Sequence, residues 1–181
     1  MGCKEPSWHN RPTGHSKPST PLSQWLFDRG SLTSRLQHLS HGQFRVEVLS
    51  QGWGKPRLSE ARSLGISPRR YALVREVILY GQDQPWVYAR SILPQCTLTG
   101  RLRSLRKLDN RPLGAMLFND PAMYRSPIEI ACFKADNPLI PQKVRSTTPL
   151  WGRRSRFYLD NKPLLVCEIF LDAFNQTLSA Q

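Results

Sequence analysis

The alternation of apolar and polar residues predicts several β-strands. Residues 44–53 alternate with the period of two that is typical of a half-buried strand. Four other stretches form two predicted hairpins, each with a short polar turn between its strands. The predicted hairpin strands are 71–80 with 85–94 and 151–159 with 163–171, and one further strand is predicted at 126–133. Because strands and helices do not alternate regularly, the pattern predicts an α+β fold with a largely antiparallel sheet.

Apolar residues spaced three or four positions apart predict short helices. Leu22, Trp25 and Leu26 share one helical face, and Ser31 is a suitable N-cap for a second helix that begins at Leu32. These two helices form a predicted helical hairpin. Further helices are predicted at 97–108 and 110–120, and loops at 54–70 (with one short helical turn) and 134–149.

The chain of 181 residues is long enough for one domain with its own core, predicted at 21–175. Residues 1–20 contain three prolines and little apolar spacing, which predicts a flexible N-terminal tail that is ordered only if Trp8 docks. Residues 176–181 are predicted to form a short C-terminal tail.

The first predicted hairpin contains two arginines that deserve comparison. If Gln82 and Asp83 form a two-residue loop, Arg75 lies directly opposite Arg90. Two like charges in that position destabilise a sheet, so a ligand with carboxylates is one candidate to bridge them. A structural ion pair with a glutamate such as Glu129 is the other candidate, and the turn 81–84 allows other registers.

The last predicted strand contains one carboxylate, Glu168, among apolar side chains. Burying an unpaired carboxylate is unfavourable, so Glu168 must be ion-paired, protonated or bonded to a ligand. A two-residue turn would pair it with Arg153, and a three-residue turn with Arg154. The residues alone leave a structural ion pair and a ligand contact equally open.

The net charge of +13 first suggests nucleic acid as a partner. However, the basic residues are spread along the chain without tracts, and 19 of the 26 are Arg. The planar guanidinium suits carboxylate recognition, so a small anionic ligand is favoured over nucleic acid.

Several other classes of protein are disfavoured. The four cysteines and four histidines show no metal-ligand spacing, and no Gly-rich phosphate loop occurs, so neither a metal nor an organic cofactor is expected. No run approaches the ~18 apolar residues of a membrane span, and no secretory signal is visible. Pro6 stands where a myristoylation pattern has Ser or Thr, so no membrane anchor is expected and a cytoplasmic location is predicted.

Five segments of the sequence together resemble one bacterial enzyme family. They are, in chain order, DRGSLTSRL, LVREVILYGQDQPWVYARSILP, RPLGAMLF, IEI, and WGRRSRF followed by KPLLVCEIFL. The combination resembles the chorismate pyruvate-lyases, which begin ubiquinone synthesis, and the resemblance covers about residues 22–172.

The resemblance implies a single α+β domain with a six-stranded antiparallel sheet. It also implies an enclosed site beneath two small helix-turn-helix flaps. The implied reaction converts chorismate to 4-hydroxybenzoate and pyruvate without metal or organic cofactor. The implied partners are therefore chorismate and 4-hydroxybenzoate, with the protein acting as a monomer.

The resemblance also assigns candidate site residues. Arg75 corresponds to the arginine that grips the ring carboxylate, and Glu168 to the glutamate near the ring hydroxyl; these two are the candidate catalytic residues. Leu113 is implied to bind through its backbone, and Leu32 to occupy a flap position where methionine is also found. We further predict that the enolpyruvyl carboxylate is held by Arg90, or by Arg153 or Arg154.

Two alternative functions stay open from the sequence. The implied fold resembles effector-binding domains of bacterial transcription regulators, so a non-catalytic domain that senses small aromatic acids is one alternative. Such domains normally follow a winged-helix module, which the first twenty or so residues are too few to form. Nucleic-acid binding is the second alternative, because of the net charge.

Overall fold

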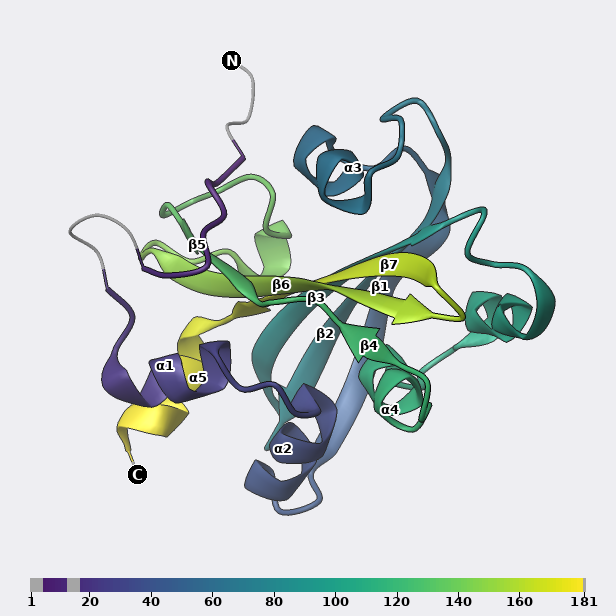
Figure 1. Cartoon of the computed structure of the whole chain (residues 1–181). Helices are drawn as coiled ribbons and strands as arrows, with labels where there is room; N and C mark the ends of the chain where they lie inside the picture. Colours follow the sequence, from purple (N-terminus) through teal and green to yellow (C-terminus); the bar gives the residue numbers. More distant parts are fainter. Residues whose placement is uncertain (1–4, 13–16, 181) are drawn as a thin grey trace.

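The computed structural model describes residues 5–12 and 17–180, and Figure 1 shows the whole chain. Its strands are β1 Phe44–Gly54, β2 Ala72–Gly81, β3 Gln84–Pro94, β4 Tyr124–Arg125, β5 Glu129–Phe133, β6 Leu150–Leu159 and β7 Lys162–Phe170. Its α-helices are α1 Thr20–Leu26, α2 Leu32–Leu39, α3 Leu58–Leu64, α4 Leu113–Phe118 and α5 Asp172–Ser179. Two 3-10 helices, η1 Gly100–Lys107 and η2 Gln142–Val144, complete the described part. None of these helices is long and apolar enough to cross a membrane.

The strands form one antiparallel sheet in the order β1-β2-β3-β7-β6-β4, and β5 also pairs with β6. Strands β4 and β5 occupy different stretches of the same edge, since β4 pairs with Phe157 and Tyr158 and β5 with residues 150–154. The sheet of the described residues is therefore six strands wide although seven strands build it. The predicted α+β class and antiparallel sheet are confirmed.

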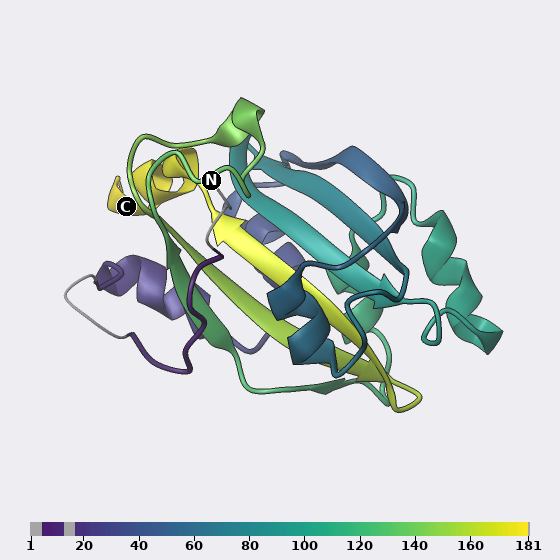
Figure 2. The ribbon, with the colours of Figure 1, turned by 90° about the horizontal axis from the view of Figure 1, so that it is seen from above.

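Helices and loops cover both faces of this sheet. In Figure 1, α2 and α4 lie below the sheet and α3 lies above it, and Figure 2 shows α3 over β7. On the lower face, α1, α2 and α5 pack on residues such as Val77, Val87 and Phe170, while η1 and α4 pack on Leu73 and Phe157. Two separate apolar clusters therefore pack on the lower face of the sheet, and the part of that face between them is available for a site.

The first hairpin has the predicted two-residue loop but not the predicted register. Gln82 and Asp83 both adopt positive φ, as hairpin loops of two residues require. A bulge follows: Tyr80 pairs with Pro85 but Leu79 pairs with Val87, so Trp86 is the extra residue. As a result Arg75 pairs with Ser91, and Arg90 pairs with Glu76. The predicted pairing of Arg75 with Arg90 is wrong.

Gly81 makes room for the bulge. A Cβ atom on Gly81 would lie 2.1 Å from a ring carbon of Trp86, whose side chain is fully buried. The indole ring therefore fills the space that any larger residue at position 81 would occupy. This close packing explains why the extra residue turns inward rather than toward solvent.

The second hairpin follows the shorter of the two predicted turns. Asp160 and Asn161 form its two-residue loop with positive φ, and Leu159 pairs with Lys162. In this register Arg153 lies directly opposite Glu168. The two-residue option in the sequence analysis is thus the correct one.

Both predicted tails are partly integrated into the domain. Trp8 packs edge-on against Phe133, and the backbone of His9 exchanges two hydrogen bonds with Ile130. The condition for order in the N-terminal segment, docking of Trp8, is met within residues 5–12. At the other end, α5 runs to Ser179 with Leu178 packed in the core, so the predicted start of the C-terminal tail at residue 176 is corrected.

Candidate active site

A largely enclosed cavity lies between the lower face of the sheet and the helices α2 and α4. Its free volume is about 40 Å³. The sheet supplies Val46, Arg75, Val77, Leu79, Ala89, Ser91, Arg125, Arg153, Phe157, Val166 and Glu168. The cover supplies Leu32 and Thr33 from α2 and residues 112–114, 117 and 118 around α4. The site is an apolar chamber with a few charged groups in its floor.

Arg75 is the charged residue that β2 contributes to the floor. It is 3% exposed, and its Nη1 donates to Gln51 Oε1 at 2.7 Å. Its Nη2 donates to the carbonyl oxygens of Asp109 at 2.7 Å and Arg111 at 3.2 Å. Burial lowers the pKa of Arg75 from its ordinary value, and the nearby charge of Asp109 opposes this effect. The guanidinium is therefore fixed in place but has no carboxylate within salt-bridge distance among the described residues.

Glu168 is the carboxylate of this cavity, and Arg153 holds it. Arg153 Nε donates to Glu168 Oε2 at 2.7 Å, while Arg153 Nη1 donates to the carbonyl oxygens of Trp25 and Asp28. The side chain of Arg153 is 1% exposed and that of Glu168 is 16% exposed. The structural ion pair considered from the sequence is present, and it lies in the cavity wall, so the pair and a ligand contact are compatible.

Arg125 on β4 is a third arginine in the same wall, and it is not among the residues predicted from the sequence. It follows a stretch with no clear period and precedes Ser126 and Pro127, which mark a break before the next strand. Its backbone pairs with Phe157, whose ring lies 5.0 Å from the Arg125 guanidinium carbon. Only the pairing of β4 with β6 brings it to the site, so no local signal in the sequence could have identified it.

The cavity arginines also hold the covering segments. Arg75 bonds to the backbone just before α4, and Arg153 bonds to the backbone at the end of α1 and in the turn that follows it. The two covers touch each other, because a Cβ atom on Gly114 would lie only 3.0 Å from Thr33 Oγ1. The helix pairs α1–α2 and η1–α4 correspond to the two predicted flaps, and Leu32 and Leu113 lie on their inner sides.

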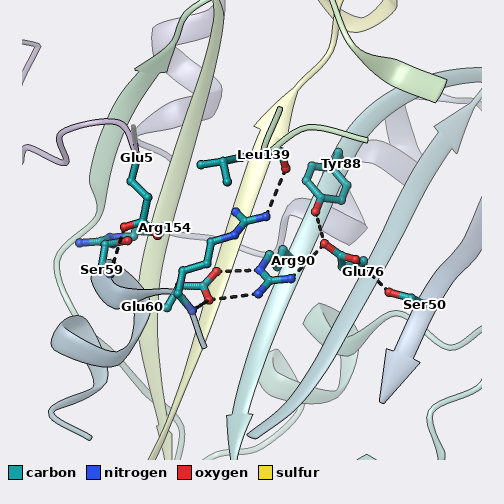
Figure 3. Close-up of polar contacts among 10 residues, drawn as sticks. Glu5, Ser50, Ser59, Glu60, Glu76, Tyr88, Arg90, Leu139 and Arg154 are labelled. Carbon is teal, nitrogen blue, oxygen red and sulfur yellow. Dashed lines mark hydrogen bonds and ion pairs between the residues drawn. The ribbon is translucent and has the colours of Figure 1, made fainter. Parts of the chain in front are cut away.

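Arg90 lies on the opposite face of the sheet, away from this cavity. Figure 3 shows its guanidinium between Glu60 and Glu76. Arg90 Nε donates to Glu60 Oε1 at 2.7 Å, and Nη1 donates to Glu76 Oε1 at 3.0 Å. Burial alone would lower the pKa of Arg90, but these two carboxylates outweigh it and raise the pKa. Arg90, predicted from the sequence to bind substrate, does not line this cavity, because the bulge at Trp86 turns its side chain to the other face.

Arg154 is also on that opposite face. Its Nε donates to Glu129 Oε2 at 2.8 Å, and its guanidinium lies 4.5 Å from the ring centre of Trp8. Of the three arginines considered for the second carboxylate, only Arg153 therefore faces the cavity. The structure brings Leu32, Arg75, Leu113 and Glu168 together around one space.

Comparison with known proteins places the chain in a family. A sequence profile for the family described as chorismate lyase matches residues 4–178. The chain belongs to the chorismate lyase family. Among curated members, the probable chorismate pyruvate-lyase of Pseudomonas aeruginosa (strain UCBPP-PA14) is 45% identical over 156 residues, which is 86% of each chain. The probable chorismate pyruvate-lyase of Methylococcus capsulatus is 42% identical, covering 84% of this chain and 95% of the relative.

Solved structures show that the fold of this chorismate lyase family member is shared more widely. The effector domain of PhnF from Mycobacterium smegmatis superposes with a TM-score of 0.55 at 16% identity, covering 80% of this chain and 90% of that domain. A GntR-family transcriptional regulator from Bacillus cereus gives a TM-score of 0.52 at 12% identity, covering 72% and 93%. At this identity the similarity concerns the fold alone.

Proposed function

We propose that this protein is a chorismate lyase, which converts chorismate to 4-hydroxybenzoate and pyruvate. The observation that supports this most directly is that Arg75 and Glu168 both line one enclosed and largely apolar cavity. Membership of the chorismate lyase family supports the same reaction. The cavity offers a cation for a carboxylate and an acceptor for a hydroxyl, which are the two polar ends of 4-hydroxybenzoate.

In this proposal Arg75 binds the carboxylate on ring carbon C1. Its bonds to Gln51 and to the backbone at residues 109 and 111 fix the guanidinium before substrate arrives. Glu168 accepts a hydrogen bond from the hydroxyl on C4, and Arg153 keeps the carboxylate oriented. Preorganised groups of this kind need no rearrangement during the reaction, which is a main source of enzymatic acceleration.

The reaction is an elimination that makes the ring aromatic. The C4–H bond breaks and its electron pair forms the new ring double bond. The C3–O bond breaks, and its electron pair leaves on the oxygen of the enolpyruvyl group. The proton finally resides on the methylene carbon of that group, which gives pyruvate. No metal or organic cofactor is needed for this balance, and the apolar walls exclude water from the reacting carbons.

One assay tests the proposal. Purified protein is incubated with chorismate in the presence of EDTA, and 4-hydroxybenzoate and pyruvate are quantified over time. Equal amounts of the two products, formed at a rate proportional to protein, are expected. Binding of 4-hydroxybenzoate without turnover would instead indicate an effector-sensing domain. Salt-dependent retention on heparin together with no turnover would indicate a nucleic-acid-binding protein.

Further parts of the proposal concern the setting of the reaction. We place it at the first committed step of ubiquinone synthesis, in the cytoplasm, with the protein acting as a monomer. The cavity is complete within one chain, since both its floor and its cover come from the described residues of a single copy. Sedimentation of the active protein as a single species of ~21 kDa tests the monomer, given the chain mass of 20.8 kDa.

A further inference from the structure

Arg125 is a buried arginine in the cavity wall with spare hydrogen-bonding capacity. It is 7% exposed, and its Nε donates to Ser155 Oγ at 3.1 Å. Its Nη1 donates to the carbonyl oxygens of Arg29 at 3.1 Å and Asp28 at 3.4 Å. Within residues 5–12 and 17–180, its Nη2 makes no hydrogen bond. One edge of the guanidinium is therefore anchored, and the remaining nitrogen is free for a ligand in the cavity that Arg125 lines.

The charges around the cavity leave two guanidinium groups without a carboxylate. Three arginines line the space but Glu168 is the only acidic residue among the lining groups, and Arg153 already bonds to it. No carboxylate of the described residues lies within 4.0 Å of Arg75 or Arg125, although each buried charge calls for a counter-charge. The cavity is thus matched to a ligand with two negative groups.

The electrostatic setting of Arg125 agrees with this reading. Burial lowers the pKa of Arg125 to about 10, and the positive charge of Arg153 contributes in the same direction. The charges of Glu168 and Asp28 oppose this effect only in part, and the guanidinium is still protonated at neutral pH. An incoming carboxylate would offset both the free-energy cost of the buried charge and the repulsion from Arg153.

The geometry of chorismate decides where its second carboxylate must lie. The ring carboxylate on C1 and the hydroxyl on C4 are at opposite ends of the ring, and the enolpyruvyl ether on C3 is next to C4. If Arg75 binds the carboxylate on C1 and Glu168 binds the hydroxyl on C4, the enolpyruvyl group on C3 must lie near Glu168, because C3 is next to C4. Arg125 is tied to that end through Ser155, which pairs with Val166 two residues before Glu168.

We infer that Arg125 is a substrate-binding residue that takes the enolpyruvyl carboxylate of chorismate. This inference rests on the proposed function and adds to it the residue that distinguishes substrate from product. Arg153 is less suited, because its charge is already paired with Glu168, whereas Arg125 bonds only to a hydroxyl and to backbone carbonyls. Once pyruvate leaves, 4-hydroxybenzoate has no group that reaches Arg125.

The test compares two ligands on one variant. The probes are 4-hydroxybenzoate, with one carboxylate, and 3-(carboxymethoxy)-4-hydroxybenzoate, a stable compound with a second carboxylate on an ether beside the hydroxyl. For Arg125→Gln we expect about tenfold to hundredfold weaker binding of the two-carboxylate probe by calorimetry. Binding of 4-hydroxybenzoate should change by less than about threefold, and kcat/KM for chorismate should fall by about a hundredfold.

The matched control is Arg156→Gln. Arg156 is on β6 beside the same edge, but it faces the other side of the sheet and bonds to the carbonyl of Ser63. The control removes the same charge, and both ligands should bind to it as to the wild type. This separates a specific contact from a general loss of positive charge.

Two outcomes would overturn the inference. Equal weakening of both ligands would mean that Arg125 only holds the turn between α1 and α2, through Asp28 and Arg29. Unchanged binding of the two-carboxylate probe would mean that the second carboxylate lies elsewhere. If Arg125→Gln does not fold, Arg125→Lys gives the same comparison with the charge kept and the planar fork lost. If the wild type forms no product from chorismate, the proposed function fails, and the probe comparison still tests Arg125.

Discussion

Arg153 and Glu168 face each other across β6 and β7, with 2.7 Å between Arg153 Nε and Glu168 Oε2. This bond uses one oxygen of the carboxylate and leaves the other able to accept from a ligand. A carboxylate that is already fixed by a buried guanidinium is well suited to orient a hydroxyl. The ion pair therefore has a structural role and a positioning role at once.

Glu168→Gln is expected to retain measurable turnover, because an amide oxygen can still accept the hydroxyl hydrogen bond. We expect kcat to fall by about a hundredfold and to stay well above the uncatalysed rate. Steady-state kinetics with chorismate measures this. Glu129→Gln is the control, since Glu129 pairs with Arg154 on the opposite face. Complete loss of turnover with unchanged affinity for 4-hydroxybenzoate would show that Glu168 is a general base instead.

Arg75→Ala should weaken 4-hydroxybenzoate binding by at least about a hundredfold, because it removes the charge-assisted contact to the ring carboxylate. Isothermal titration calorimetry measures the affinity. Arg103→Ala, an exposed residue of η1, is the control with the same change of charge. An affinity equal to that of the wild type in folded Arg75→Ala would rule out Arg75 as the anchor.

Release of 4-hydroxybenzoate is expected to be slow. Arg75, Leu32 and Leu113 are all buried in the closed cavity, so α2 or α4 must move before the product can leave. When such a motion limits turnover, product forms in a burst during the first cycle. Rapid-quench measurement with protein and chorismate at comparable concentrations detects the burst. A linear time course from the first turnover would contradict this prediction.

Arg90→Met should lower the free energy of unfolding by about 3–5 kcal/mol, because it leaves the buried Glu60 and the half-buried Glu76 without their shared partner. Urea denaturation measures the loss. Removing one orphaned charge as well, in Arg90→Met/Glu60→Leu, should restore part of the stability. Affinity for 4-hydroxybenzoate should stay within about threefold of the wild type in either folded variant. A larger loss of affinity would place Arg90 back in the site.

Gly81→Ala should destabilise the protein by about 3 kcal/mol, because the added methyl group overlaps the Trp86 ring. Gly52→Ala on β1 is the control, since a Cβ there would meet no atom within 4 Å. Thermal unfolding of both variants measures the difference. Equal stability of the two variants would show that Trp86 can leave its position without penalty.

Much of the sheet can be predicted from local patterns, because strand period and turn residues are local properties. The pairing of Arg153 with Glu168 follows directly from the two-residue loop at Asp160 and Asn161. The pairing of Arg75 could not be predicted in the same way. The bulge at Trp86 depends on an indole ring packing over Gly81 and against Phe174, and residue 174 is distant in the sequence.

The residues of the candidate site differ in the same way: some can be identified from local sequence patterns and one cannot. Arg75 and Glu168 stand out in the sequence because each is a charge within an apolar strand. Arg125 does not stand out, because β4 is two residues long and its charge is buried by distant segments such as β6 and the turn between α1 and α2. Residues whose surroundings come from distant segments are the ones that sequence patterns cannot identify.

The bulge at Trp86 determines which side chains of β3 face the cavity, and these side chains determine how deep the cavity is. With the extra residue, the small side chains of Ala89 and Ser91 form the floor beneath the ligand space. If the same residues paired regularly from the loop without a bulge, the bulky Tyr88 and Arg90 would point there and fill that space. A bulge formed by a residue that does not line the cavity therefore governs the room available to a substrate, because it keeps two small side chains rather than two bulky ones beneath the ligand.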